Sequence, residues 1–257
     1  MITAGIDMGA KNVKVVVLRD GEVIGRAMKA AGFEAAETAH QVLEAALKEA
    51  GVTRSAVQKL VATGAGREDA PDQDSNLTEV GCVSRAATHL VPEVRTVIDV
   101  GAEEGRAIRC GDHGKVVDFA INEKCAAGSG AFTEAMARAL EVSIDELGPL
   151  SLKSTKAIPM NAQCAVFAES EVVSMIHSNV AKPDMARSVH DAIASRIISM
   201  VRKVGYTPPL MLVGGLARNV GFVDSLKRGL EIDDLHIPDN PEFCAALGAA
   251  LAAAADA

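Results

Sequence analysis

One element occurs twice in this sequence and limits the folds open to it: a short apolar strand, an Asp-x-Gly turn and a second strand. The first copy reads GIDMGAKNVKVVV and contains Asp7, and the second reads VIDVGAEEGRAI and contains Asp99. Short apolar runs bounded by Gly-containing turns are typical of buried strands. No proline-rich or low-complexity linker separates the two copies, so the sequence predicts two lobes of related architecture.

Strand and helix patterns alternate around both copies, which indicates an α/β chain rather than a helical bundle. We expect a small N-terminal lobe, residues 1–65, completed by a C-terminal helix within 242–257, and a larger lobe, residues 66–241, hinged to it over a cleft. Strands are expected at 2–6, 13–18, 22–28, 59–63, 95–100, 106–110, 115–121 and 210–213, and helices at 35–50, 76–90, 129–141, 165–178, 184–204 and 242–255.

Three loops carry residues suited to phosphates and a metal ion: the turn after Asp7, the turn after Asp99, and LMLVGGLARNVGF near the C-terminus. Glycine in a turn lets backbone N–H groups approach phosphate oxygens, and an aspartate at a strand end can hold hydrated Mg²⁺ or orient the attacking water. A Gly-Gly pair at a strand-to-helix junction presents a helix N-terminus. We predict Asp7 and Asp99 as catalytic and the following nucleotide contacts: Gly9, Ala10, Lys11, Asn12, Gly101, Ala102, Glu103, Gly214, Gly215 and Asn219.

Other nucleotide motifs do not fit. The sequence has no GxxxxGK[ST] segment and its glycine spacing fails the GxGxxG pattern, so neither a P-loop nor a dinucleotide fingerprint is predicted. The three loops instead predict an ATP site of a different kind.

Two of the five cysteines, Cys125 and Cys164, begin predicted helices after polar residues, in NEKCAAGSGAF and NAQCAVFAESE. A helix N-terminus stabilises a thiolate or a thiolate-bound cluster. Two thiolates cannot complete a four-cysteine [4Fe–4S] site, but two chains can. From spacing alone, two interpretations of these cysteines therefore remain open. They could form half of an inter-subunit cluster, or they could be buried or helix-capping thiols. Cys82, Cys110 and Cys244 are expected to be core residues.

Composition narrows the function further. The 257 residues carry a formal net charge of −8, which argues against a large nucleic-acid footprint. The N-terminus lacks the pattern of a signal peptide, and no apolar stretch reaches the length of a membrane span, so a cytoplasmic protein without membrane partners is expected.

Taken together, KCAAGSGAF, NAQCAVFAESE, VGGLARNVGF and the terminal CAALGAAL resemble the BadF/BcrA-type ATPase family, nearly end to end. This family comprises the activators of 2-hydroxyacyl-CoA dehydratases and the ATP-binding subunits of class I benzoyl-CoA reductases. Its fold is the two-lobed actin/Hsp70/sugar-kinase fold, with RNase H-like lobes around a nucleotide cleft. The wording of DVGAEEGRAI is most similar to the D-type subunit of benzoyl-CoA reductase.

The resemblance also implies a mechanism. Cys125 and Cys164 would ligate a [4Fe–4S] cluster between two subunits, and the loops at Asp7, Asp99 and Gly214-Gly215 would bind ATP and Mg²⁺. Hydrolysis would drive low-potential electrons from ferredoxin to a catalytic iron–sulfur module that reduces an aromatic acyl-CoA ring.

The sequence departs from the family at its phosphate turns. Ala10-Lys11-Asn12 stands where activators usually carry Ser or Thr, and Ala102-Glu103-Glu104 replaces Gly-Gln-Asp. These departures suit a specialised subunit paired with a related ATPase chain. The alternatives are a homodimeric dehydratase activator, a small-molecule kinase of the same fold acting, for example, on an amino sugar, and a non-catalytic ATP sensor.

Overall fold

The structure is a computed structural model that describes residues 1–122, 128–160 and 164–255. Its contacts form two compact units. The first unit comprises Met1–Val94, Cys110–Val117 and Glu242–Ala257, and the second comprises Arg95–Arg109 and Asp118–Pro241. The sequence predicted two lobes, residues 1–65 plus 242–257 and residues 66–241. That division concerns which parts of the chain move together, and it stays a prediction.

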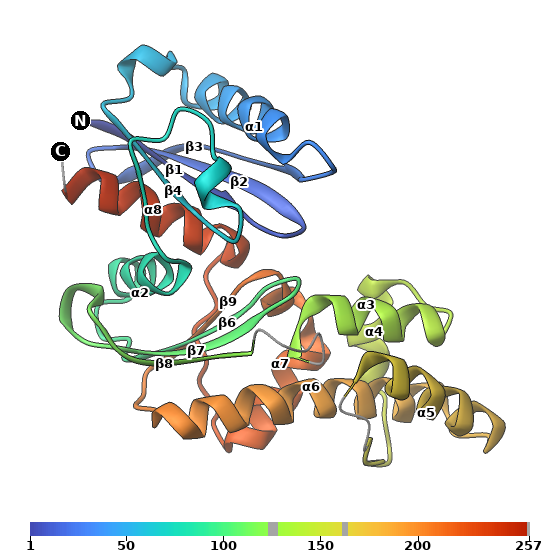
Figure 1. The fold of residues 1–257 in the computed structure, drawn as a ribbon. Helices are drawn as coiled ribbons and strands as arrows, with labels where there is room; N and C mark the ends of the chain where they lie inside the picture. The colour runs from blue at the N-terminus through green and yellow to red at the C-terminus, as the bar shows by residue number, and fades with distance from the viewer. Residues whose placement is uncertain (123–127, 161–163, 256–257) are drawn as a thin grey trace. The chain divides into compact units, whose positions relative to one another are not determined.

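The first unit contains a five-stranded sheet in the order β3-β2-β1-β4-β5 (Figure 1). β1, β2 and β3 form an antiparallel meander, and β4 and β5 continue the sheet in parallel. The tight β2–β3 connection uses Asp20 and Gly21, both with positive φ, as the Asp-Gly pair predicts. The strands are Ile2–Met8 (β1), Asn12–Arg19 (β2), Glu22–Ala30 (β3), Lys59–Thr63 (β4) and Ser75–Asn76 (β5).

Alternate residues of β1 serve two different layers. Ala4 and Ile6 join the core formed with α1, Ala35–Ala50, whereas Gly5 faces α8, Cys244–Ala255. A Cβ on Gly5 would lie 2.1 Å from the carbonyl oxygen of Ala246. The alanine-rich α8 therefore packs its backbone against the sheet, with α2, Glu79–Leu90, beyond it. Asp7 is an odd-numbered residue of β1 like Gly5, so it lies on the same face of the strand as Gly5.

The second unit repeats the strand pattern. Its sheet has the order β8-β7-β6-β9, with β7 antiparallel and β9 parallel to β6. This matches β2 and β4 around β1, so the duplication expected from the sequence is present in the fold. The strands are Thr96–Val100 (β6), Gly105–Cys110 (β7), Val116–Asn122 (β8) and Leu210–Val213 (β9).

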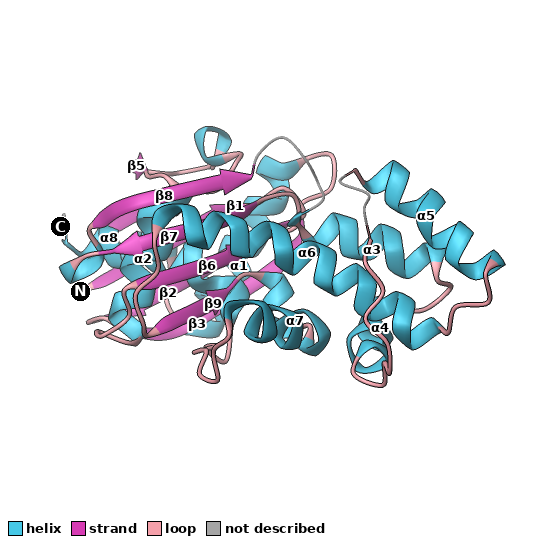
Figure 2. Cartoon of the chain, turned by 90° about the horizontal axis from the view of Figure 1, so that it is seen from below, coloured by secondary structure: helices cyan, strands magenta, loops and turns pink. Residues whose placement is uncertain are grey.

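The helices of the second unit, labelled in Figure 2, share one hydrophobic core, and Ile98, Val100 and Ala107 of the sheet belong to it. They are α3 (Gly130–Ala139), α4 (Ile144–Ser151), α5 (Ala165–His177), α6 (Lys182–Val204) and α7 (Val220–Leu230). The expected helices at 129–141, 165–178 and 184–204 are confirmed, whereas α4 was not expected. Short 3₁₀ turns lie at Arg54–Ala56, Arg67–Asp69, Asp112–Gly114, Gly215–Arg218 and Pro241–Phe243. In the part of the chain described, no helix is both long and apolar enough to cross a bilayer.

Candidate functional site

Asp7 lies at the end of β1 with its two carboxylate oxygens in different surroundings. The residue is 3% exposed, and its neighbour across the antiparallel pair is Lys14. The Lys14 Nζ atom lies 2.7 Å from Asp7 Oδ2, while the buried Oδ1 has no hydrogen-bond partner. An unpaired buried carboxylate oxygen is costly unless a ligand, ion or water completes it. Oδ1 is thus suited to a hydrated cation.

Two glycines keep space beside this oxygen. Gly64 follows β4 with φ +95°, and a Cβ there would lie 2.6 Å from both Asp7 Oδ1 and the Met8 carbonyl oxygen. A Cβ on Gly9 would lie 2.8 Å from the Asn12 carbonyl oxygen. Only residues without a side chain allow the backbone to approach so closely.

Asp99 repeats this arrangement in the second unit. Its antiparallel neighbour is Arg106, whose Nη1 atom lies 2.9 Å from Asp99 Oδ2, and the ion pair is buried. The other Arg106 nitrogen, Nη2, binds Glu104. Gly214 follows the parallel neighbour β9 with φ +86°, and a Cβ there would lie 2.7 Å from Asp99 Oδ1.

Sequence reasoning found both aspartates and noted Arg106 in the second loop, but it did not pair Arg106 with Asp99, and it missed Lys14 and Gly64. The signal was present, because each cation follows its aspartate by seven positions (14 − 7 and 106 − 99). That spacing carries the chain out of one strand, round the turn and back opposite the aspartate in the next.

The structure places the remaining predicted nucleotide contacts in three turns. Residues 9–11 form the β1–β2 turn beside Asp7 and Asn12 begins β2, residues 101–103 lie in the β6–β7 turn after Asp99, and Gly214 and Gly215 follow β9. Lys11 and Glu103 are exposed. The sequence suggested that the Gly-Gly pair opens the next helix directly, and this prediction is wrong. A 3₁₀ turn, Gly215–Arg218, intervenes before α7.

Asn219 is the N-cap of α7. Its side-chain oxygen accepts hydrogen bonds from the backbone N–H groups of Gly221 and Phe222, at 3.0 and 3.1 Å. Gly221 also borders the imidazole of His190, because a Cβ there would lie 2.7 Å from His190 Cε1. His190 is fully buried and its ring nitrogens make no well-formed hydrogen bond. Burial lowers the pKa of His190 to about 4. Sequence reasoning assigned no role to this histidine.

Cys164 is the N-cap of α5 and is half-buried, as expected for a thiol at a helix start. The other predicted ligand, Cys125, lies outside the described residues. Cys82, Cys110 and Cys244 are buried, which confirms them as core residues. Burial raises the pKa of Cys82 to about 11, so this thiol stays protonated.

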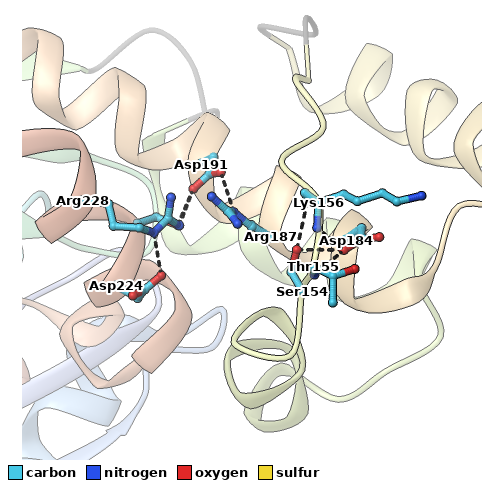
Figure 3. A network of polar contacts seen from close by, with 9 residues as sticks. Ser154, Thr155, Lys156, Asp184, Arg187, Asp191, Asp224 and Arg228 are labelled. Carbon is cyan, nitrogen blue, oxygen red and sulfur yellow. Dashed lines mark hydrogen bonds and ion pairs between the residues drawn. The ribbon is translucent and has the colours of Figure 1, made fainter.

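Two polar clusters brace the helices of the second unit (Figure 3). Asp184 Oδ1 accepts hydrogen bonds from Ser154 Oγ and from the N–H groups of residues 155 and 156, at 2.8 to 3.0 Å. The hydrogen bond from Ser154 lowers the pKa of Asp184. Asp184 therefore holds residues 154–156 beside the start of α6.

The second cluster joins α6 to α7. Asp191 accepts from Ser225 at 2.6 Å and from Arg228 at 2.8 Å, and Arg228 also binds Asp224 at 2.9 Å (Figure 3). The charges in it are paired, which is typical of a structural network.

Solved structures confirm the fold. Component A of (R)-2-hydroxyglutaryl-CoA dehydratase from Acidaminococcus fermentans superposes with a TM-score of 0.93 at 33% identity, covering 100% of this chain and 98% of that one. A ROK hexokinase from Thermus thermophilus has a TM-score of 0.54 at 16% identity, covering 100% of this chain and 99% of that one. The chain thus has the actin/Hsp70/sugar-kinase-like ATPase fold.

Relatives of known name share nearly the whole chain. The 2-hydroxyisocaproyl-CoA dehydratase activator of Clostridioides difficile is 35% identical over 98% of this chain and 94% of its own length. The activator of lactoyl-CoA dehydratase from Anaerotignum propionicum is 37% identical over 98% and 96%, and the D-type subunit of benzoyl-CoA reductase from Thauera aromatica is 34% identical over 97% and 92%. A profile of the BadF/BadG/BcrA/BcrD ATPase family matches residues 4–253. The chain belongs to this family.

Proposed function

We propose that this chain is the ATP-hydrolysing electron-donor component of an acyl-CoA dehydratase or reductase system, and that it carries half of an inter-subunit [4Fe–4S] cluster. The observation that carries the ATPase part is the duplicated arrangement of aspartate, cation and positive-φ glycine at Asp7 and Asp99. Membership of an ATPase family and an ADPNP-bound activator of the same fold, at 34% identity and a TM-score of 0.92, support it.

The residues around both aspartates fit ATP and Mg²⁺. Asp7 would hold a magnesium-bound water with its unpaired Oδ1 atom, while Lys14 keeps the carboxylate oriented. Asp99, held by Arg106, would orient the hydrolytic water. The N–H groups of Gly9, Ala10, Lys11 and Asn12, with those of Ala102 and Glu103, would bind phosphate oxygens, and Gly214, Gly215 and Asn219 would border the nucleoside. The N–H of Gly101 donates to the Glu104 carbonyl oxygen at 2.9 Å, so Gly101 would shape the turn rather than bind phosphate.

Cys125 and Cys164 would supply two thiolates to the cluster, and a second chain would supply two more. When bound, the cluster supplies the low-potential electron. Cys164 fits this role because it is half-buried at the N-terminus of a 13-residue helix, where the dipole and free N–H groups favour negative charge. Ferredoxin would be the electron donor to this component.

The acceptor is proposed to be a 2-hydroxyacyl-CoA dehydratase, because the activators are the relatives with identities of 35 to 37%. The sequence alone favoured a class I benzoyl-CoA reductase of the D type. That interpretation remains the second candidate, supported by the altered turn at Ala102-Glu103-Glu104 and by 34% identity to the D-type chain of that reductase. The sugar-kinase alternative shares the fold alone.

The test is anaerobic expression with iron and sulfide. We expect a brown protein with acid-labile sulfide that hydrolyses ATP and, with ATP and a reductant, transfers electrons to a 2-hydroxyacyl-CoA dehydratase. Transfer only to a benzoyl-CoA reductase core would select the second candidate. A colourless protein that phosphorylates a sugar would refute the electron-transfer function.

A further inference from the structure

We infer that Thr63 is a positioning residue of the proposed magnesium site, and that its hydroxyl and Asp7 Oδ1 together hold one water of the hydrated cation. The inference rests on the proposed function and adds a residue to it. Thr63 is the last residue of β4, the strand that lies beside β1 in the first unit (Figure 1). Sequence reasoning gave it no role.

The register of the sheet places Thr63 next to Asp7. β1 and β4 are parallel, with Thr63 opposite Asp7 and Val61 opposite Gly5. Residues two positions apart in a strand share a face, so Thr63 lies on the same face of β4 as Val61. That face packs against α8, as the face of β1 that carries Gly5 and Asp7 does. The side chains of Asp7 and Thr63 are therefore neighbours on adjacent strands.

Two atoms of this pair lack a hydrogen-bond partner. Thr63 is fully buried, and neither its Oγ1 atom nor Asp7 Oδ1 has a partner. Lys14 binds the other oxygen, Oδ2, whereas a Cβ at Gly64, directly after Thr63, would lie 2.6 Å from Oδ1. Oδ1 is therefore turned toward the end of β4. An unpaired donor beside an unpaired acceptor, without a direct hydrogen bond, is an arrangement that one shared water completes.

A thiol is the other polar neighbour of this hydroxyl, and it does not replace the water. The Cys82 side chain of α2 lies near Thr63 but makes no well-formed hydrogen bond with Oγ1. Burial raises the pKa of Cys82 to about 11, so the group is a neutral thiol, which is both a weak donor and a weak acceptor. The Thr63 hydroxyl is therefore left to a water at Asp7.

The second unit provides an internal comparison. Its aspartate, Asp99, has Val213 opposite it in the parallel neighbour, where Asp7 has Thr63, and a positive-φ glycine follows both residues. Valine has nearly the shape of threonine and is buried without leaving a hydroxyl unpaired. In the described part of the chain, the oxygens of Asp99 are not among the buried atoms that lack a partner. Of these two strand ends, the one with a hydroxyl is thus the one whose aspartate keeps an unpaired oxygen.

Two buried threonines of the same sheet give matched variants. Thr63→Val removes the hydroxyl and keeps the shape, and Thr63→Ser keeps the hydroxyl. Thr3→Val is the control, because the Thr3 hydroxyl donates to the Ala250 carbonyl oxygen at 3.0 Å. Without nucleotide, the urea midpoint of Thr3→Val should fall below that of the wild type. The midpoint of Thr63→Val should equal or exceed the wild-type value, because no hydrogen bond within the protein is lost.

The second measurement is calorimetric titration of the full chain with a non-hydrolysable ATP analogue, in EDTA and at increasing Mg²⁺ concentrations. The Mg²⁺ concentration that gives half-maximal binding should rise about tenfold or more in Thr63→Val, since a residue that orients a metal-bound group contributes on that order to metal affinity. It should stay close to the wild-type value in Thr63→Ser and Thr3→Val. Affinity for the analogue in EDTA should be the same in all of these proteins. Thr63→Ala replaces Thr63→Val if that variant does not fold.

The outcomes separate two failures. A wild-type Mg²⁺ dependence in Thr63→Val, or an equal loss in Thr63→Ser, would overturn this inference alone, because the hydroxyl would then have no part in the site. A urea midpoint of Thr63→Val as low as that of Thr3→Val would also overturn it, since the hydroxyl would then serve the fold. Failure of the wild type to bind the analogue at any Mg²⁺ concentration would refute the proposed function, and the inference would fall with it.

Discussion

At the residue scale, Asp7 of the first unit and Asp99 of the second each bind a cation from the next strand, and the two cations differ. Lys14 offers Asp7 a flexible ammonium, while Arg106 binds Asp99 and Glu104 together in a planar fork. This difference favours a metal-facing role for Asp7, which keeps a free oxygen, and an orienting role for Asp99.

The first prediction concerns these carboxylates. Asp7→Asn and Asp99→Asn keep the shape of the side chain but remove its charge. We expect kcat for ATP hydrolysis to fall by roughly 100-fold in each, with a much smaller change in the Kd for ATP. Steady-state ATPase rates and equilibrium nucleotide titration measure both quantities. Asp20→Asn, at the exposed β2–β3 turn, is the control. Wild-type rates in both site variants would contradict the assignment.

The second prediction uses adjacent glycines. Ala at position 214 would need φ +86° and would bring Cβ to 2.3 Å from the Val100 carbonyl oxygen, whereas nothing lies within 4 Å of a Cβ at position 215. Gly214→Ala should therefore cost about 2 kcal/mol or more in unfolding free energy, and Gly215→Ala should be close to neutral. Urea denaturation of the two variants compares them directly. Equal midpoints would argue against the backbone geometry described for this turn.

The third prediction concerns Cys164. Replacement by serine in every subunit would leave two of four thiolate ligands at the shared cluster. We expect iron and acid-labile sulfide to fall to background after anaerobic purification, and subunit association to weaken on gel filtration. Cys244→Ser, which changes a buried thiol of α8, should retain wild-type iron content. Iron at the wild-type level in Cys164→Ser would remove Cys164 from the ligand set.

At the element scale, the strands and long helices were predictable because their side chains follow simple periods. α4 was not expected, because Gly148 and Pro149 interrupt its pattern, although the Ser143–Glu146 capping box is a helix-start signal that the sequence contains. Lys14 was missed for a related reason: a lysine in a strand usually points to solvent, and only the hairpin register places it against Asp7. A single copy of the pattern does not reveal that register, and only a comparison of the two copies shows the same seven-residue spacing in both.

Helix α6 supplies the prediction at this scale, through His190. Its pKa is about 4 when folded and near 6.5 when unfolded, so the unfolded chain binds a proton that the folded chain excludes. The associated stability is complete above pH 6.5 and is lost as the pH falls through 4. Between pH 7 and 5 it should decline by about 2 kcal/mol.

Replacement of His190 by glutamine isolates this contribution. His190→Gln will be less stable at pH 7, because the site is closely packed, but its additional loss between pH 7 and 5 should be smaller than that of the wild type. Urea unfolding at both pH values measures the difference. The same decline in both proteins would show that other groups, such as carboxylates, cause the acid sensitivity.

At the scale of the whole molecule, the sequence was sufficient for the fold and the family but not for the acceptor. The duplicated strand–Asp–x–Gly–strand element specifies an ATPase fold because it recurs in two sheets of matching order. The acceptor enzyme is recognised by surfaces, and surface side chains leave no periodic signal. The dehydratase activators are 35 to 37% identical to this chain and a benzoyl-CoA reductase subunit is 34% identical, so whole-chain similarity favours a dehydratase by a narrow margin only.

The last prediction concerns assembly, which separates the two candidate systems. One chain offers two proposed cluster ligands, so a cluster-bearing particle must contain at least two chains. If the chain is a dehydratase activator, expression alone under anaerobic conditions should give a dimer of identical chains with about four iron atoms per dimer and ATPase activity. If it is a D-type reductase subunit, as its altered phosphate turns suggest, the chain alone should lack iron and gain it only with a related ATPase subunit. Sedimentation velocity combined with iron analysis, on the chain alone and after co-expression, distinguishes these results. A monomer that still carries four iron atoms would contradict both, because it would require ligands other than Cys125 and Cys164.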